Sequence, residues 1–100
     1  RVTMTETLTT FFEPIEKEEI YFLEFPKTDV LEDKSLKRQR IASLTRGLAF
    51  GNISQLKIEI YFEDSESKKV VNTTIWDITD DKVILKKDVF IPINRIYYSQ

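Results

Sequence analysis

Neither cysteine nor histidine occurs in the 100 residues of this chain. The absence of cysteine excludes disulfide bonds, so the sequence gives no indication of redox compartment. Thiolate and imidazole are the usual protein ligands of zinc, copper and iron, so their joint absence argues against a transition-metal site. Histidine is also the commonest general base near neutral pH, and no other residue here is an obvious activator for a serine or threonine nucleophile. We therefore expect no enzymatic activity and no cofactor.

Glycine and proline are scarce, with two and three residues, which makes a linker or a low-complexity segment a poor interpretation. No apolar run approaches the roughly 20 residues that a membrane span needs. The first residues also lack the basic region followed by an apolar stretch that marks a signal peptide. We therefore expect a cytoplasmic protein without membrane contact. The hydrophobic fraction of 41% is enough for the core of one domain, spanning residues 1–100.

Charge is distributed unevenly along the chain, although the net charge is only −2. Residues 1–32 carry eight acids and three bases, residues 33–54 carry one acid and five bases, and the remainder is nearly balanced. Such blocks of one sign are candidates for contact with a partner of the opposite sign. The basic block in the middle is the main electrostatic feature of the sequence.

The N-terminal segment, residues 1–32, contains more apolar side chains than an idle tail needs. Residues 3–9 alternate threonine with other residues, which is typical of an edge strand or an extended arm. Residues 19–25 predict a short strand that is apolar on both faces and ends at Pro26. Such a strand needs cover on both sides. The segment either packs on its own domain or pairs with a neighbouring subunit, and the sequence leaves both possibilities open.

One amphipathic helix is predicted from about residue 35 to residue 50. Asp33 or Ser35 can cap its N-terminus, because a short side-chain oxygen accepts hydrogen bonds from free backbone amides there. Gly51 can adopt the left-handed conformation that ends helices. At about 100° per residue, three apolar side chains share one face. These are Ile41, Leu44 and Leu48.

Residues 55–98 predict five short strands separated by polar turns. The expected strands are 56–62, 68–78, 83–85, 89–91 and 96–98. In the second strand both the odd and the even positions are partly apolar, as in a strand that bends and packs on two sides of a barrel. Pro92 interrupts the chain between the last two, because proline cannot donate a ladder hydrogen bond. The predicted fold class is α+β: an N-terminal extended strand, one helix, and a five-stranded antiparallel barrel or strongly curved sheet.

This order of elements resembles the small barrels of the Sm-like and SH3-like folds over about residues 36–98. The stretch Phe-Ile-Pro-Ile-Asn-Arg-Ile at residues 90–96 is similar to the strand, single 3₁₀ turn and strand that close those barrels. The resemblance implies a closed five-stranded barrel without exposed edges. Residues 57–96 also look like an uncharacterised family of small bacterial proteins, and that membership implies no function.

The nucleotide-binding residues of Sm proteins have no counterparts here. Those proteins place an asparagine in the turn before the third strand, where this chain has Asp80-Asp81-Lys82. They place an arginine-glycine pair where this chain has Pro92-Ile93. The resemblance therefore transfers no nucleotide-binding residue to this chain.

Five basic side chains of the helix are the candidate site for an anionic partner. They are Lys34, Lys37, Arg38, Arg40 and Arg46. They either face phosphates or an acidic partner, or they form a solvated helix face that pairs with the acidic N-terminal segment of the same chain. We favour the second interpretation, because one side of most helices in small domains is charged.

The remaining candidates are weaker. Aromatic side chains on a sheet face can stack bases or bind a peptide, and five residues are candidates: Tyr61, Trp76, Phe90, Tyr97 and Tyr98. We expect Trp76 and Phe90 to lie in the core. We expect Tyr97 and Tyr98 to bury their rings while their hydroxyl groups stay in contact with water. Two acidic clusters, Asp77-Asp80-Asp81 and Glu63-Asp64-Glu66, lack the spacing of a calcium loop, so we assign them to turns. A serine-lysine pair such as Ser35 with Lys34 is adjacent in sequence, which does not establish catalytic geometry.

The sequence therefore predicts a non-enzymatic binding or assembly module. We expect it to self-associate as a homo-oligomer, and a different protein partner remains possible. The alternative is an Sm-like protein that binds single-stranded nucleic acid through the basic helix face.

Overall fold

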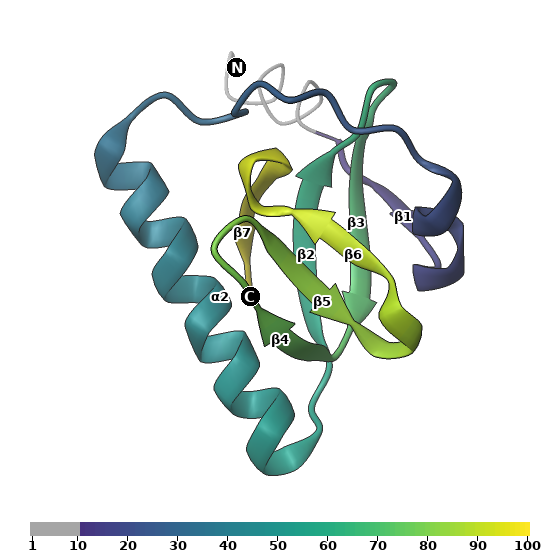
Figure 1. The fold of residues 1–100 in the computed structure, drawn as a ribbon, viewed down its shortest axis with the longest axis vertical. Helices are drawn as coiled ribbons and strands as arrows, with labels where there is room; N and C mark the ends of the chain where they lie inside the picture. Colours follow the sequence, from purple (N-terminus) through teal and green to yellow (C-terminus); the bar gives the residue numbers. More distant parts are fainter. Residues whose placement is uncertain (1–10) are drawn as a thin grey trace, which may run out of the picture.

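The computed structural model describes residues 11–100 as an α+β protein, with one long helix beside two sheets (Figure 1). The stretch 3–9, predicted as a strand or an arm, lies outside the described residues. Seven strands are present in the described part of the chain. They are β1 (Glu13–Ile15), β2 (Ile58–Glu63), β3 (Lys68–Thr73), β4 (Ile75–Ile78), β5 (Lys82–Leu85), β6 (Phe90–Pro92) and β7 (Ile96–Ser99). The helical elements are η1 (Lys17–Phe22), α2 (Lys34–Ser54), η2 (Lys86–Asp88) and η3 (Ile93–Arg95), of which the η elements are 3₁₀ helices.

The strands form two sheets, and the prediction of a closed five-stranded barrel is wrong for the described residues. One sheet has the order β1-β3-β2-β7 and the other the order β4-β5-β6. The predicted strand 68–78 breaks at Thr74, so β3 ends in the first sheet and β4 begins the second. This break and the short β1 together raise the strand count from five to seven. Pro92 stands at the end of β6, an edge strand, where a missing amide leaves no ladder hydrogen bond unmade.

The strand predicted at residues 19–25 is also wrong, because residues 17–22 form the 3₁₀ helix η1. The local hydrogen bonds explain the difference: the Glu16 amide donates to the Glu19 carboxylate at 3.1 Å, and the Leu23 amide donates to the Ile20 carbonyl at 3.0 Å. Within η1 only Ile20 is buried. The N-terminal strand lies earlier, at β1, and pairs parallel with β3.

Helix α2 begins where predicted and ends later than predicted. The Asp33 carboxylate caps it by accepting from the amides of Ser35 and Leu36. The helix continues through Gly51 to Ser54, and Gln55 takes the left-handed conformation with φ of 53°. Gly51 is therefore not the stop signal that the sequence suggested.

The buried face of α2 consists largely of small residues, so the helix is less amphipathic than predicted. Leu44 is fully buried and Leu48 is half-buried, but Ile41 is 45% exposed. Gly47 and Gly51 face the sheets, and a Cβ at Gly51 would lie 2.6 Å from the backbone oxygen of Ile75. These glycines allow the helix to pack closely against β4 and β7, the edge strands of the two sheets.

The core lies between the sheets and under α2. Its buried side chains are mainly isoleucine, valine and leucine from alternate strand positions, with Phe62 as the largest. Trp76 and Phe90, predicted in the core, are instead 53% and 47% exposed. They point outward from the sheet β4-β5-β6, and the ammonium group of Lys82 lies 4.5 Å from the centre of the Phe90 ring. None of the helices described has the length and apolar character that crossing a lipid bilayer requires.

Candidate binding surfaces

The five basic residues of the predicted site do not form one surface. Arg40 is buried, with 4% of its surface exposed, and Lys37 is partly covered. Lys34, Arg38 and Arg46 are exposed. The structure therefore removes Arg40 from any site that needs a free cation and leaves three residues that meet this requirement.

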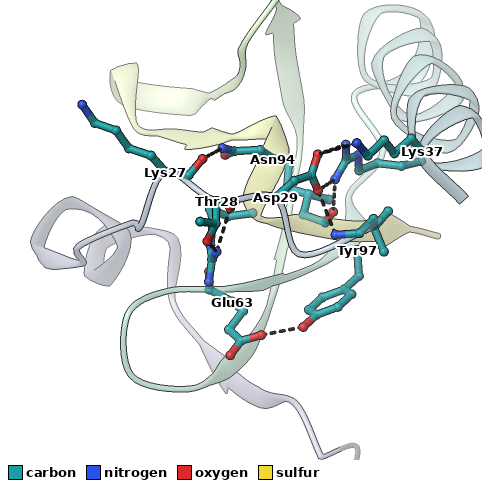
Figure 2. Close-up of polar contacts among 11 residues, drawn as sticks. Lys27, Thr28, Asp29, Lys37, Glu63, Asn94 and Tyr97 are labelled. Atoms are coloured by element: carbon teal, nitrogen blue, oxygen red, sulfur yellow. Dashed lines mark hydrogen bonds and ion pairs between the residues drawn. The ribbon is translucent and has the colours of Figure 1, made fainter. Parts of the chain in front are cut away.

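Arg40 is held by Asp29, which belongs to the acidic N-terminal segment. The two terminal guanidinium nitrogens of Arg40 donate to the two carboxylate oxygens of Asp29 at 2.9 and 3.0 Å (Figure 2). The ammonium group of Lys37 lies 3.8 Å from the same carboxylate. Burial raises the pKa of Asp29, but hydrogen bonds from Arg40 and from the Leu31 amide outweigh it, so the pKa lies below its ordinary value. Two of the five predicted cations thus serve the fold of their own chain.

Side chains of α2 complete the outer edge of strand β7. Arg40 also donates to the carbonyl of Ile96 at 3.0 Å, and the hydroxyl of Ser43 accepts from the amide of Ser99 at 3.1 Å. An edge strand normally presents unpaired backbone groups that attract other strands. Here two side chains of the helix take the place of a neighbouring strand.

The turn η3 fastens the N-terminal segment to the sheets (Figure 2). The side-chain amide of Asn94 donates to the carbonyl of Lys27 at 2.6 Å, and the amide of Val30 donates to the carbonyl of Asn94 at 2.9 Å. Arg95 is buried and donates to the carbonyls of Thr28 and Glu63. The sequence analysis missed Arg95; its position in an otherwise apolar stretch, after Ile93 and before Ile96, was the available signal.

Tyr97 and Glu63 make a second tie at the same end of the molecule. The Tyr97 hydroxyl donates to the Glu63 carboxylate (Figure 2). Burial and this hydrogen bond raise the pKa of Tyr97 to about 12. The Tyr97 ring is half-buried, as predicted, but its hydroxyl is paired with a carboxylate. Tyr98, also predicted to bury its ring, is instead 40% exposed.

Most members of the two acidic clusters lie in turns, as expected, but Asp77 lies in β4 and Glu63 is the last residue of β2. The buried Asp64 accepts hydrogen bonds from the amides of Glu66 and Ser67 and from the ammonium group of Lys69. Burial raises the pKa of Asp64, but these hydrogen bonds bring it below its ordinary value. Asp81 accepts from the hydroxyl of Thr79 in the turn before β5. Residues 11–100 bring no three acidic side chains together in a geometry for a metal ion.

A serine-lysine contact exists in the structure, but its chemistry is that of a structural pair. The ammonium group of Lys69 donates to the hydroxyl of Ser67 at 2.7 Å and to the carboxylate of Asp64 at 2.9 Å. The Lys69 ammonium is thus shared between a buried carboxylate and the Ser67 hydroxyl, which is the arrangement of a buried ion pair that holds the 64–69 turn together.

The outer face of α2 is an exposed basic surface, made by Lys34, Arg38, Ala42, Thr45, Arg46 and Ala49. The three cations of this face form no ion pair with any described residue. The helix holds no acidic residue between positions 34 and 54. Its small side chains leave the cations projecting above the surface.

An exposed aromatic pair forms a second surface, on η1. Tyr21 and Phe22 are 79% and 81% exposed, and their rings meet edge to face with centroids 5.5 Å apart. We call this pair the aromatic knob. Three exposed acids flank it: Glu18, Glu19 and Glu24. The sequence signal was present, because the apolar run 20–23 lies within the acidic segment, but a strand was the wrong interpretation of it.

Several hollows indent the surface of the described residues, and two of them lie beside α2 and the aromatic side chains. A cleft of about 850 Å³ lies between the C-terminal end of α2, the start of η1 and the bend from β3 to β4, with Trp76 on its wall. A smaller groove of about 270 Å³ lies beside β7 and is lined mainly by apolar and aromatic side chains, including Leu36 and Tyr98.

Comparisons with protein families, with curated proteins and with solved structures found no match for this chain. The function therefore has to be argued from these surfaces.

Proposed function

We propose that this protein is a non-enzymatic assembly module that binds further copies of itself. The observation that carries the proposal is the exposure of large apolar side chains at two separate places. Tyr21 and Phe22 of the aromatic knob are each about four-fifths exposed, and Ile53 near the end of α2 is 82% exposed. Large apolar groups that gather on a surface mark protein interaction sites, because burying them against a partner removes them from water.

The chemistry of the chain supports a binding role over catalysis. Histidine and cysteine are absent, and the ammonium group of the buried Lys69 forms an ion pair with the carboxylate of Asp64. Hydrogen bonds join one segment of the chain to another, from Arg40 to the carboxylate of Asp29 and from Arg95 to backbone carbonyls nearby. These contacts fix surfaces in place rather than presenting reactive atoms.

Light scattering on the purified protein across micromolar concentrations tests the proposal. We expect the mass to rise above that of the 11.8 kDa monomer as concentration increases. A mass that stays monomeric over the whole range would overturn the proposal. Replacing Tyr21 and Phe22 with serine removes exposed apolar area without touching the core, so this variant should keep its fold and associate more weakly.

The second candidate is binding of single-stranded nucleic acid by the outer face of α2, as the resemblance to Sm-like proteins suggests. The observation in its favour is the acid-free helix with three exposed cations. Replacing Lys34, Arg38 and Arg46 with alanine should abolish binding of a fluorescent oligonucleotide, and the wild-type affinity should fall with salt. Replacing the exposed Lys27, Lys57 and Lys86 with alanine is the matched control. Wild-type protein that shows no salt-sensitive binding would exclude this candidate.

A further inference from the structure

The aromatic knob and the outer face of α2 lie on different sides of the molecule. In Figure 1, α2 forms one flank, η1 is the dark coil beyond β1 at the opposite margin, and the sheets stand between them. The buried face of α2 packs on β4 and β7, so its outer face points away from the rest of the domain. The two surfaces of one copy therefore do not meet each other.

From these positions we infer that the aromatic knob of one copy docks on the outer face of α2 of the next copy. The inference rests on the self-association proposed above and specifies the surfaces that carry it. The contact is heterologous, because it joins two different patches, and repetition of it produces a ring or an open chain of copies.

Charge complementarity selects this pairing. The knob is flanked by the exposed carboxylates of Glu19 and Glu24 and by that of Glu18, which also pairs with Lys17 at 2.9 Å. The outer face of α2 instead presents Arg38 and Arg46 without any acid in the helix. The other exposed apolar tip, around Ile53, carries no acid between positions 50 and 57 and would gain nothing from these cations. Opposite potentials on two patches favour their encounter and fix their orientation.

The small side chains and the arginines on the outer face of α2 also suit contact with the aromatic knob. Ala42 lies between the two arginines and Ala49 lies about one turn beyond Arg46, so small side chains leave room for aromatic rings against the helix. Guanidinium groups stack on aromatic faces more readily than ammonium groups do. Tyr21 and Phe22 therefore bring the kind of surface that Arg38 and Arg46 can cover.

Charge reversal and mixing test the inference. One double variant, Glu18→Lys with Glu24→Lys, makes the flanks of the knob basic. The other, Arg38→Glu with Arg46→Glu, makes the outer face of α2 acidic. Each variant alone places like charges against each other, so we expect its dissociation constant to rise at least about tenfold. In an equimolar mixture every contact again joins opposite charges, and association should return to the wild-type level.

Matched variants control for net charge and for folding. Asp77→Lys with Asp80→Lys, and Lys27→Glu with Lys82→Glu, alter surface residues outside both surfaces and should associate like the wild type. Circular dichroism confirms that each variant is folded. Raising the salt from about 0.05 M to about 0.5 M should weaken wild-type association, because screening shortens the reach of exposed charges.

The outcomes separate this inference from the proposed function. Wild-type protein that is monomeric at every concentration overturns the proposed function. Wild-type protein that assembles, while both reversed variants assemble equally well, overturns this inference alone. Reversed variants that fail alone and also fail when mixed overturn it too, because a heterologous contact of opposite charges must be restored by mixing.

Discussion

At the scale of single residues, the pair of Asp29 with Arg40 is the most sensitive point of the structure. The Arg40 side chain is 5% exposed, so removing its partner leaves a buried charge without compensation. We expect Asp29→Asn to lower the free energy of unfolding by about 2–4 kcal/mol, toward the low end because Asp29 is itself a quarter exposed.

Lys37→Ala is the matched control for that substitution. It removes a 3.8 Å contact with the same carboxylate from a side chain that is 42% exposed, so its cost should stay below about 1 kcal/mol. Urea unfolding of both variants measures the difference. Equal stabilities for the two would contradict the assignment of the main ion pair to Arg40.

Acid should destabilise the protein through the same carboxylate and through Asp64. Both groups have a folded-state pKa below the ordinary value, so the unfolded chain binds protons first as the pH falls. Their contribution to stability is complete above the unfolded pKa of about 3.9 and is lost as the pH falls through the folded values. Unfolding measured from neutral pH downward should show this loss, and Asp29→Asn should reduce its size.

The sequence predicted the chemistry of single residues better than their burial. Arg40 was grouped with the exposed cations, although it stands one helical turn before the buried Leu44, a spacing that places both on the same face. Trp76 was expected in the core because of its size, yet its strand turns that position outward. Periodicity shows which side chains share one face of a helix or strand. Which of its faces packs on the rest of the domain depends on contacts between residues that are distant in sequence.

At the scale of elements, the two glycines of α2 should respond differently to alanine. A Cβ at Gly51 meets the backbone oxygen of Ile75 at 2.6 Å, whereas a Cβ at Gly47 meets the tip of the Ile58 side chain at 2.4 Å. A backbone oxygen cannot move aside, but a side-chain methyl can rotate. We expect Gly51→Ala to destabilise by about 1–3 kcal/mol, as overpacking does, despite the better helix propensity of alanine.

Gly47→Ala should cost less, because gains in helix propensity offset a shift of Ile58. Thermal unfolding of the two variants checks the order. A Gly51→Ala protein that is more stable than the Gly47→Ala protein would show that α2 does not pack on β4 as closely as described.

Element types were largely predictable where periodicity was strong, as in α2, β2 and β3, whereas the 3₁₀ turn after Pro92 was expected from the resemblance to small barrels. The failures have physical causes. Residues 17–22 formed a 3₁₀ helix, because glutamate hydrogen bonds compete locally with strand geometry. Closure of a barrel depends on pairing between strands distant in sequence, which periodicity does not report. The exposed face of α2 was predictable from its charges, whereas the knob needed the structure to place Tyr21 and Phe22 outside.

At the scale of the whole molecule, a heterologous contact gives an assembly two different ends. One end carries a free knob and the other a free outer face of α2. A copy with the Glu18→Lys and Glu24→Lys changes keeps a native helix face but has a knob that repels the next helix. Small amounts of this variant should shorten wild-type assemblies in proportion to the amount added, and light scattering measures the effect. A symmetric dimer would show no such shortening.

Because α2 donates and accepts hydrogen bonds at the outer edge of β7, the solubility of the protein depends on this helix staying docked. If the helix lifts away, the Ile96 carbonyl and the Ser99 amide lose their partners, and the strand becomes a template for foreign strands. We therefore expect detachment of α2, well short of complete unfolding, to promote aggregation through this edge. Strong acid, well below the unfolded pKa of about 3.9, favours that event, because protonation of Asp29 weakens its hold on Arg40 at this edge.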